Sequence, residues 1–326
     1  MDKIRWGILA TGKIAHKFAQ GLQLLPGAVI QAIGSRSAES AKNFADTYRI
    51  PNIHTSYESL AADPEVDVIY VATPHPGHKE HSLLCLENGK HVLCEKPFAV
   101  NAREAQIMVA KAREKNLFLM EAMWTRFMPA NVELRKILQD QVIGEVRMLT
   151  ADFGFASQFD ALSRIYNPDL AGGALLDVGI YPISFAYMVF GQEPVHLSST
   201  ASICSTGVDD QSAYLFGYAN GALARLSSSV ATETSREAVI HGAKGFIRVP
   251  LFWKASEIYL QVEGKEGVTY KFPYPGTGLQ FQAKEVMDCI REGKTESTIM
   301  PLDETLRIMH CLDRIRAQWG MKYPME

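Results

Sequence analysis

The sequence lacks any long uncharged hydrophobic run. Its longest apolar stretch, residues 174–190, is interrupted by Asp177, Gly179 and Pro182, whereas a membrane-spanning helix needs about 20 apolar residues. The N-terminus enters an apolar run at once and lacks the basic region, apolar region and cleavage site of a signal peptide. We therefore expect a cytoplasmic protein with no membrane partner.

Cysteines and basic clusters are also scarce. The chain has 5 cysteines among 326 residues, widely spaced and without a Cys-x-x-Cys pair, which favours free thiols in a reducing compartment. The net charge is -3 and no block of Lys and Arg stands out, so the composition argues against a nucleic-acid partner. Hydrophobic residues make up 47% of the chain, enough for the cores of two domains.

In the N-terminal part of the chain, short apolar runs alternate with helical patterns. Strands that are apolar throughout and separated by helices are typical of a parallel sheet covered on both faces, the doubly wound α/β pattern. We expect strands at Ile4–Leu9, Val29–Gly34, Val66–Ala72, Val92–Cys94 and Phe118–Met120. We expect helices at Ile14–Gln23, Ala38–Tyr48 and Lys79–Asn88, and a further helix that begins after a cap at Asn101.

The pattern changes after Trp124. Several strand-like runs with turn signals follow one another over residues 195–273, which predicts a large, mainly antiparallel sheet. We expect an N-terminal Rossmann domain over residues 1–123 and a substrate-binding and dimerisation domain of the α+β class over residues 124–326. A strand at Val146–Phe155 and helices at Met128–Gln139, Gly173–Phe190, Leu279–Glu292 and Leu302–Trp319 complete the prediction.

The turn after the first strand has the spacing of a dinucleotide-binding motif. Read as G-x-G-x-x-G/A, it is Ala10-x-Gly12-x-x-Ala15, with only the middle glycine present. Such a turn lets backbone N–H groups reach a pyrophosphate at the N-terminus of the next helix; an ordinary strand–turn–helix is the alternative. The cofactor-binding residues predicted here are Ala10, Thr11, Gly12, Lys13 and Ile14.

The end of the second strand indicates which cofactor is bound. NAD sites place an Asp or Glu about 20 residues beyond the glycines to bind the ribose hydroxyls, but this chain has Gly34-Ser35-Arg36-Ser37 there. Arg36 can bind a 2′-phosphate through a charge-assisted fork, and Ser35 or Ser37 can donate hydrogen bonds to it. NADP(H) is therefore predicted rather than NAD; the alternative is a solvated Arg36 near a helix start.

Two further loops follow strand ends, where the ligand crevice of such a sheet lies. One is Thr73-Pro74-His75-Pro76-Gly77-His78, and the other is Glu95-Lys96-Pro97. His75, His78 and His81 have no acidic or Cys partner at zinc-site spacing, so no metal is predicted.

Four motifs occur in order along the chain: the first-strand turn, Thr-Pro-x-x-x-His, Glu-Lys-Pro, and Gly-Gly-x-Leu-x-Asp-x-Gly-x-(His/Tyr), the last at residues 172–181. Together they resemble the glucose–fructose oxidoreductase/inositol dehydrogenase (Gfo/Idh/MocA) family. Residues 120–129, 176–181, 207–210 and 299–302 narrow the resemblance to the branch that contains dimeric dihydrodiol dehydrogenase and NADP-dependent D-xylose dehydrogenases. The resemblance covers essentially the whole chain.

The resemblance implies catalytic roles for three residues. Lys96 would lie close to the nicotinamide and the reacting oxygen, Tyr181 would be the acid/base, and Asp177 would bind substrate or hold the site together. Thr73, Pro74, His78, Glu95 and Lys96 would line the cofactor crevice.

The chemistry independently suits a lysine and a tyrosine. Oxidising an alcohol removes a hydroxyl proton as hydride leaves the carbon, and reduction needs a proton donor. A free tyrosine, with a pKa of about 10, is a poor base at neutral pH, and a nearby ammonium group lowers that pKa. The ammonium can also stabilise the alkoxide. The alternatives are a solvated Lys96 and a Tyr181 that only packs in the core, whereas a buried Asp177 needs a partner.

Four residues near the start of the second domain are predicted to wall the substrate pocket, with core packing as the alternative. They are Trp124, Arg126, Phe127 and Phe153.

The sequence thus predicts an NADP(H)-dependent oxidoreductase acting on a small cyclic polyol, aldose or trans-dihydrodiol. A non-catalytic NADP-binding transcriptional co-regulator of the same fold, or a purely structural or binding domain, is the alternative. A density of large apolar residues in the C-terminal strands predicts a homodimer through that sheet. These residues are Phe216, Tyr218, Phe246, Ile247, Val249, Leu251, Phe252 and Trp253.

Overall fold

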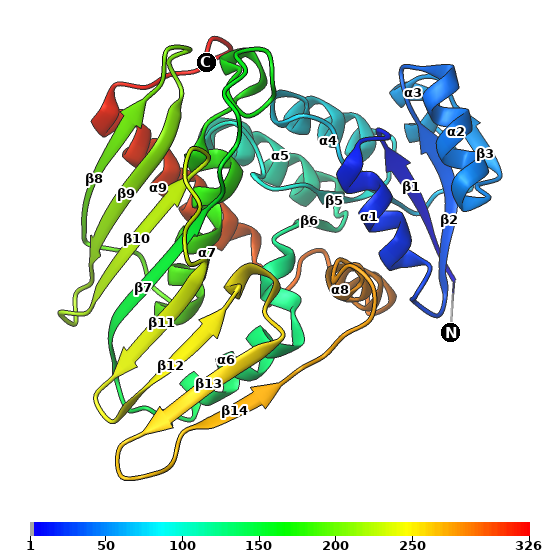
Figure 1. Ribbon diagram of the computed structural model, residues 1–326. Coiled ribbons are helices and arrows are strands. Elements are labelled where there is room, and N and C mark those ends of the chain that lie inside the picture. The colour runs from blue at the N-terminus through cyan, green and yellow to red at the C-terminus, as the bar shows by residue number, and fades with distance from the viewer. Residues whose placement is uncertain (1–2) are drawn as a thin grey trace. The chain divides into compact units, whose positions relative to one another are not determined.

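The computed structural model describes residues 3–326, which form two compact units. Unit 1 comprises the described residues up to Trp124 together with Pro275–Leu306, and unit 2 comprises Thr125–Tyr274 and Arg307–Glu326. Each unit is built around one sheet (Figure 1). The chain therefore returns to unit 1 after it has formed the strands of unit 2.

The sheet of unit 1 is parallel, as the continuous apolar runs predicted. Its strands are β1 (Ile4–Leu9), β2 (Ala28–Gly34), β3 (Asn52–His54), β4 (Val68–Val71), β5 (His91–Cys94) and β6 (Leu119–Glu121), in the order β3-β2-β1-β4-β5-β6. The order reverses between β1 and β4, and open α/β sheets bind ligands at the carboxyl ends of their strands at this point. The segments that follow β1, β2, β4 and β5 all reach this edge.

Helices surround this sheet, and three of the six begin at a polar side-chain cap. They are α1 (Lys13–Leu22), α2 (Ala38–Tyr48), α3 (Tyr57–Ala61), α4 (His78–Glu87), α5 (Ala102–Lys115) and α8 (Gln280–Arg291). Ser37, Ser56 and Asn101 cap α2, α3 and α5 by accepting the backbone N–H three residues ahead, which confirms the cap predicted at Asn101.

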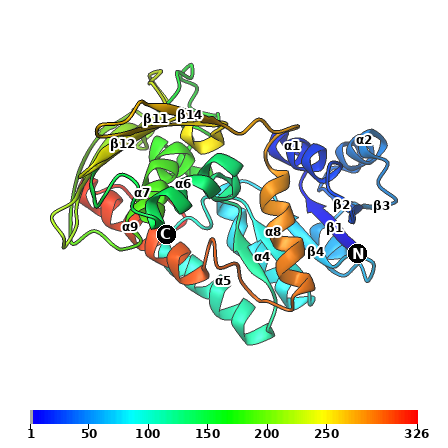
Figure 2. The ribbon, with the colours of Figure 1, turned by 90° about the horizontal axis from the view of Figure 1, so that it is seen from below.

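Helix α8 comes from the C-terminal part of the sequence but packs on α1 (Figure 2). Thr277 Oγ1 donates to Lys17 O at 3.0 Å, and a Cβ on Gly21 would lie 3.0 Å from the backbone nitrogen of Gln280. The close approach of the two helices depends on this glycine. Thus the N-terminal sequence alone does not complete unit 1.

The sheet of unit 2 is mainly antiparallel, as predicted. Its strands are β7 (Val146–Gly154), β8 (His196–Ile203), β9 (Asp209–Gly217), β10 (Leu223–Ser229), β11 (Glu237–Gly242), β12 (Gly245–Pro250), β13 (Glu257–Val262) and β14 (Val268–Lys271), in the order β14-β13-β12-β11-β7-β10-β9-β8. β7 and β10 pair in parallel. Both predicted sheets are therefore present, and the fold class is confirmed.

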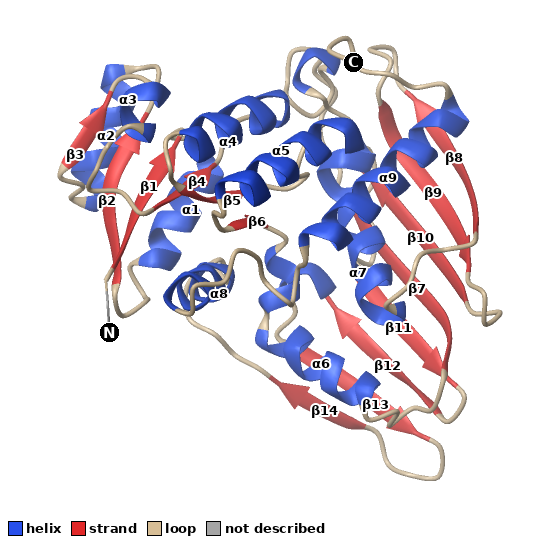
Figure 3. Ribbon diagram, turned by 180° about the vertical axis from the view of Figure 1, so that it is seen from behind, coloured by secondary structure: helices blue, strands red, loops and turns tan. Residues whose placement is uncertain are grey.

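The helices of unit 2 lie on one face of this sheet (Figure 3). They are α6 (Pro129–Gln139), a π-helix (Leu175–Gly179) that leads into α7 (Ile180–Phe190), and the part of α9 (Leu302–Trp319) that starts at Arg307. Short 3-10 helices occur at His75–Gly77, Trp124–Phe127, Pro168–Leu170 and Phe252–Lys254.

Residues 168–190 are the one described stretch that is long and apolar enough to cross a membrane. In this protein 83% of the apolar window is buried inside the fold, so the segment serves as the core helix of unit 2.

Most of the apolar residues that were expected to form a dimer face are buried inside unit 2. The choice of these residues for the interface was therefore wrong. Alternate residues of a strand point to opposite faces of the sheet. Most of the residues expected at the dimer face point instead towards the side of the sheet that the helices cover. The six buried residues are Phe216, Tyr218, Ile247, Val249, Phe252 and Trp253, whereas Phe246 is half-buried and Leu251 exposed.

Candidate active site

The turn between β1 and α1 has the features of a phosphate cradle. Ala10 has a φ of 86°, in the left-handed region that costs a residue with a Cβ about 1–2 kcal/mol. Gly12 is the N-cap residue of α1 and offers no side-chain cap, α1 has no acidic residue in its first turn, and a Cβ on Gly12 would meet nothing within 4 Å. There is thus open space beside Gly12, and no side chain caps the first backbone N–H groups of α1, an arrangement that suits pyrophosphate binding.

The other residues predicted in this turn differ in exposure. Thr11 and Ile14 are half-buried and Lys13 is exposed, while Ala15 is fully buried beneath the helix. A small residue at position 15 permits close packing of α1 on the sheet, which is the role of the third small residue in such motifs.

The serines after β2 keep hydroxyl protons available. Ser35 Oγ accepts the backbone N–H of Ser37 at 3.3 Å, and Ser37 Oγ accepts that of Ser40 at 3.2 Å. A serine that accepts one hydrogen bond still has its own proton to donate. Arg36, between the two serines, is exposed. The residues predicted to recognise a 2′-phosphate therefore lie together on one short segment.

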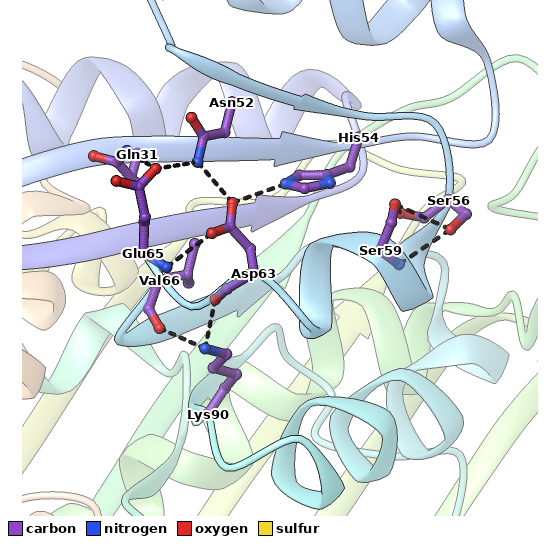
Figure 4. A network of polar contacts seen from close by, with 9 residues as sticks. All are labelled: Gln31, Asn52, His54, Ser56, Ser59, Asp63, Glu65, Val66 and Lys90. Carbon is purple, nitrogen blue, oxygen red and sulfur yellow. Dashed lines mark hydrogen bonds and ion pairs between the residues drawn. The ribbon is translucent and has the colours of Figure 1, made fainter.

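A buried carboxylate anchors β3 beside this segment (Figure 4). Asp63 Oδ2 accepts hydrogen bonds from Asn52 Nδ2 at 2.8 Å and from His54 Nε2 at 2.9 Å, and His54 O accepts the N–H of Ser35 at 3.1 Å. Burial raises the pKa of Asp63, but the hydrogen bonds from Asn52 and His54 outweigh it and hold the pKa below its usual range. Lys90, also buried, donates to the main-chain oxygens of Asp63 and Val66.

His78 joins the two predicted crevice loops from inside the fold. The side chain is fully buried; its Nδ1 lies 2.7 Å from Pro97 O and its Nε2 lies 2.8 Å from Thr73 O. Burial lowers the pKa of His78 to about 4, although the two carbonyls favour the protonated ring. Thr73 is itself buried and Pro74 exposed. His78 thus fixes the loops after β4 and β5 to each other.

Lys96 stands at the carboxyl end of β5, on a loop supported by Glu95. Glu95 is buried and accepts a hydrogen bond from the hydroxyl of Tyr70, and its Oε2 also accepts the backbone N–H of Lys96 at 3.2 Å. Lys96 is half-buried, and the Lys96–Pro97 peptide bond is cis. The buried carboxylate therefore positions the backbone from which the Lys96 side chain departs.

In unit 2, Tyr181 lies beside two stacked aromatic rings. The ring centroid of Phe153 is 5.2 Å from that of Tyr181 and 4.1 Å from that of Trp253, with the latter pair stacked. The loop that carries Trp253 is fixed by Thr125 Oγ1, which donates to Trp253 O at 2.9 Å. The Nζ of Lys254 lies 5.5 Å from the centroid of the Trp253 ring. A phenol and an aromatic wall therefore occupy one place in this unit.

Asp177 belongs to the π-helix and is paired with a residue that the sequence analysis missed. Arg164 donates to Asp177 Oδ1 at 3.1 Å and to Oδ2 at 3.3 Å. π-Helical turns occur frequently at functional sites. No local spacing in the sequence connects position 164 with position 177, so this partner could not be predicted.

The glycines of the Gly172–Tyr181 motif allow close contacts with β9 and β10. Gly173 has a φ of 113°, and a Cβ there would lie 2.4 Å from Asp209 Oδ1. A Cβ on Gly179 would lie 2.6 Å from the hydroxyl of Tyr214. Asp209 Oδ2 in turn accepts the N–H of Leu175 at 2.8 Å. Burial raises the pKa of Asp209 to about 7, against the opposing hydrogen bonds from Leu175 and Ser212.

The remaining predicted pocket residues differ in what they contact. The buried guanidinium of Arg126 donates to Ser184 O at 2.8 Å and to Ser184 Oγ, one turn after Tyr181. Phe127 is buried in unit 2, and Trp124 is half-buried and belongs to unit 1. Arg126 thus braces α7 from behind. Trp253, which was expected at a dimer face, instead stacks on the ring of Phe153.

The described residues contain no group of three or more His, Cys, Asp or Glu arranged to hold a metal ion. The five cysteines are free thiols, as predicted, and four of them are buried.

Comparison with known proteins defines the class. Residues 4–123 match an oxidoreductase family with an NAD-binding Rossmann fold, and residues 131–248 match the GFO/IDH/MocA C-terminal domain. The chain therefore belongs to the Gfo/Idh/MocA oxidoreductase family, as the motifs predicted. It is an enzyme that acts on CH–OH groups and uses a nicotinamide nucleotide.

Two curated relatives cover nearly the whole chain. The trans-1,2-dihydrobenzene-1,2-diol dehydrogenase of Xenopus tropicalis is 40% identical over 334 residues, covering 98% of this chain and 99% of that protein. The enzyme of the same name from Homo sapiens is 39% identical over 338 residues, covering 99% of each chain. The branch predicted within the family is therefore confirmed.

Solved structures of three other oxidoreductases share the fold. Aldose–aldose oxidoreductase from Caulobacter crescentus, complexed with glycerol, has a TM-score of 0.88 and 25% identity, with 97% of each chain covered. Levoglucosan dehydrogenase, complexed with NADH and levoglucosan, has a TM-score of 0.89 and 20% identity, with 98% of each chain covered. KijD10, a 3-ketoreductase from Actinomadura kijaniata, is bound to NADP and has a TM-score of 0.86, 24% identity and coverage of 97% and 98%.

Proposed function

We propose that this enzyme is an NADP(H)-dependent dehydrogenase of a small cyclic diol or aldose, with trans-dihydrodiols as the first substrates to test. The observation that carries the proposal is the contact of Tyr181 with Phe153, which stacks on Trp253. Stacked aromatic rings bind a flat or cyclic apolar ring face, and the phenol beside them can exchange a proton with its hydroxyl. Relatives at about 40% identity are named for a dihydrodiol of benzene.

The preference for NADP(H) is supported by the segment after β2. Ser35, Arg36 and Ser37 offer one guanidinium and two hydroxyl donors, and no carboxylate lies in the Gly34–Ser37 segment to repel a 2′-phosphate. Arginine binds phosphate in a bidentate fork. The uncapped N-terminus of α1, with open space at Gly12, fits the pyrophosphate of either nucleotide. We propose that Thr73 and Pro74 line the same crevice.

The nicotinamide, when bound, accepts or donates the hydride, and the protein supplies orientation and electrostatics. We propose that Tyr181 takes the hydroxyl proton during oxidation and returns it during reduction. We propose that the ammonium of Lys96 stabilises the negative charge that develops on the substrate oxygen. Asp177, fixed by Arg164, holds the turn from which the helix of Tyr181 begins.

The test is a substrate panel with both nucleotides. Trans-dihydrodiols, xylose, glucose and acyclic polyols are each incubated with NADP+ or NAD+, and the absorbance of the reduced nicotinamide is followed. The proposal predicts turnover of a cyclic substrate and a preference for NADP+ that is lost in Arg36→Ala. A preference for NAD+ in the wild type would remove the role of Arg36, and turnover of no member of the panel would remove the substrate class.

We also propose a homodimer through the outward face of the unit 2 sheet. Met148 and Leu223 are paired in adjacent strands and are 41% and 42% exposed, and Leu215, on the same face, is 49% exposed. Apolar side chains gathered on an uncovered sheet face are typical of an interface between subunits. A self-complementary face favours a two-fold dimer.

A further inference from the structure

His81 lies at the carboxyl edge of the unit 1 sheet, on the first turns of α4. Its Nδ1 is 3.0 Å from Thr73 Oγ1, and its ring meets that of Tyr57 edge-on with centroids 4.7 Å apart. The ring also lies over Gly77, where a Cβ would approach its atoms to 2.6 Å. The imidazole is therefore held in one place by groups from α3, from the loop after β4 and from the 3-10 helix at His75–Gly77.

Packing brings this imidazole towards the segment after β2. Helix α3 packs on β2, because Leu60 fills the space at Gly34, and α3 also packs on α4. Arg36 lies just after β2, and its positive charge lowers the pKa of His81. Thr73, which binds the ring, follows β4, and β1 alone separates β4 from β2 in the sheet. His81 and Arg36 therefore approach the same end of the crevice from opposite sides of β1.

One nitrogen of the His81 ring remains available for a ligand. Thr73 occupies Nδ1 and can donate to a neutral ring or accept from a protonated one. Nε2 makes no hydrogen bond with the described residues, and the side chain is half-buried rather than enclosed. A hydrogen-bond donor that becomes a cation on protonation suits a phosphate group.

We infer that His81 joins Arg36 in binding the adenosine 2′-phosphate and becomes protonated when the phosphate binds. This inference rests on the proposed use of NADP(H). The charged and titratable groups near His81 are Arg36 after β2, Tyr57 and Glu58 on α3, and His78 and Glu80 on α4. Both carboxylates are exposed and are therefore screened by solvent.

The electrostatic environment explains why protonation would accompany binding. Burial lowers the pKa of His81 below its usual range, Glu80 and Glu58 raise it, and Arg36 lowers it. A 2′-phosphate beside the ring neutralises Arg36 and adds negative charge, which favours the imidazolium. NADP+ binding near pH 7 should then take up a proton at His81, whereas NAD+ binding, without the phosphate, should not.

Proton uptake is measured by titration calorimetry at pH 7 in two buffers of different ionisation enthalpy. The 2′-phosphate, with a pKa of about 6, titrates by itself, so the comparison is between the wild type and His81→Gln. The wild type should take up as much as about one proton more than His81→Gln with NADP+, and both should behave alike with NAD+. His196→Gln, an exposed histidine in unit 2, should match the wild type.

Affinity supplies a second measurement. His81→Gln should weaken NADP+ binding by roughly fivefold at pH 6.5 and leave NAD+ binding unchanged, and the difference should vanish at pH 9. If Arg36→Ala weakens NADP+ binding but the wild type and His81→Gln take up equal numbers of protons, the role of His81 is overturned and the proposed NADP(H) site stands. If Arg36→Ala leaves NADP+ binding unchanged, the proposed NADP(H) site fails and the role of His81 fails with it.

Discussion

Arg164 holds the carboxylate of Asp177 with two guanidinium nitrogens, one on each oxygen. The Asp177 side chain is 6% exposed and that of Arg164 is 54% exposed. A carboxylate that is buried without a partner destabilises a fold. The pair connects the segment before the Gly172–Tyr181 motif to the π-helix that leads into the helix of Tyr181. It therefore ties a partly exposed arginine to the candidate catalytic helix.

Replacing Arg164 should affect activity more than stability. Because removal of the half-exposed Arg164 side chain opens the carboxylate of Asp177 to water, Arg164→Ala should lower the free energy of unfolding by only about 1 kcal/mol. Turnover should fall by roughly tenfold, since the helix that orients Tyr181 loses a fixed contact. Thermal unfolding and steady-state kinetics measure the two effects. Arg147→Ala, which removes an exposed pair with Glu145, is the control and should change neither; equal effects of the two variants would contradict the role of Arg164.

Asp209 should make the protein less stable as the pH rises. Its folded pKa of about 7 lies above the ordinary value of 3.8, so between these values the folded state keeps a proton that the unfolded state has lost. The stabilising effect of that proton is fully present below about pH 4 and is lost as the pH rises through 7. Asp209→Asn cannot titrate at this position. Its free energy of unfolding, relative to that of the wild type, should therefore rise by roughly 1–4 kcal/mol between pH 5 and pH 8. Urea unfolding at the two pH values measures this gain; a difference independent of pH would contradict it.

Asp63 should show the opposite trend. Its folded pKa is lowered, so its carboxylate stabilises the fold above the unfolded pKa, and this contribution is lost as the pH falls through the folded value. Asp63→Asn should therefore be destabilised by about 1–3 kcal/mol at pH 7, and the deficit should shrink below about pH 4. Urea unfolding of the wild type and of Asp63→Asn at pH 7 and at pH 3 measures this deficit. A deficit as large at pH 3 as at pH 7 would show that the charge of Asp63 is not what anchors β3.

A charge on the outward sheet face should separate the proposed dimer. In Leu223→Lys each subunit would present an ammonium to the same surface of its partner, because a two-fold interface repeats every residue, and unpaired buried charge is costly. Sedimentation at micromolar concentration should then give monomers, with the wild type as dimers. Leu162→Lys, at an 84% exposed position in a loop, should remain dimeric. A monomeric wild type would remove the proposal.

The parts of the fold that are set by local pattern were predictable. β1, α2 and α9 begin and end at the predicted residues. β3 and α3, with 3 and 5 residues, are too short for a periodic signal. The parallel pairing of β7 with β10 and the return of α8 to α1 depend on contacts between distant segments, which no local pattern records.

The residues of the candidate site that belong to a sequence motif were predictable. The residues of the β1 turn, the loop at Lys96 and the helix of Tyr181 each follow from a motif. Trp253 and Arg164 do not, because their roles arise from tertiary contacts with Phe153 and Asp177. The aromatic run near Trp253 was visible in the sequence, but a buried pocket wall and a subunit interface have the same apolar composition.

The most direct test of the central claim is the turnover of Tyr181→Phe and Lys96→Met with NADP+ and the best substrate of the panel. The account predicts that kcat falls by roughly 10²–10⁴-fold in each variant, while Tyr181→Phe still binds NADP+ with wild-type affinity. Tyr187→Phe, the same change two turns later on α7, should retain wild-type turnover. Wild-type turnover in Tyr181→Phe or in Lys96→Met would contradict the account.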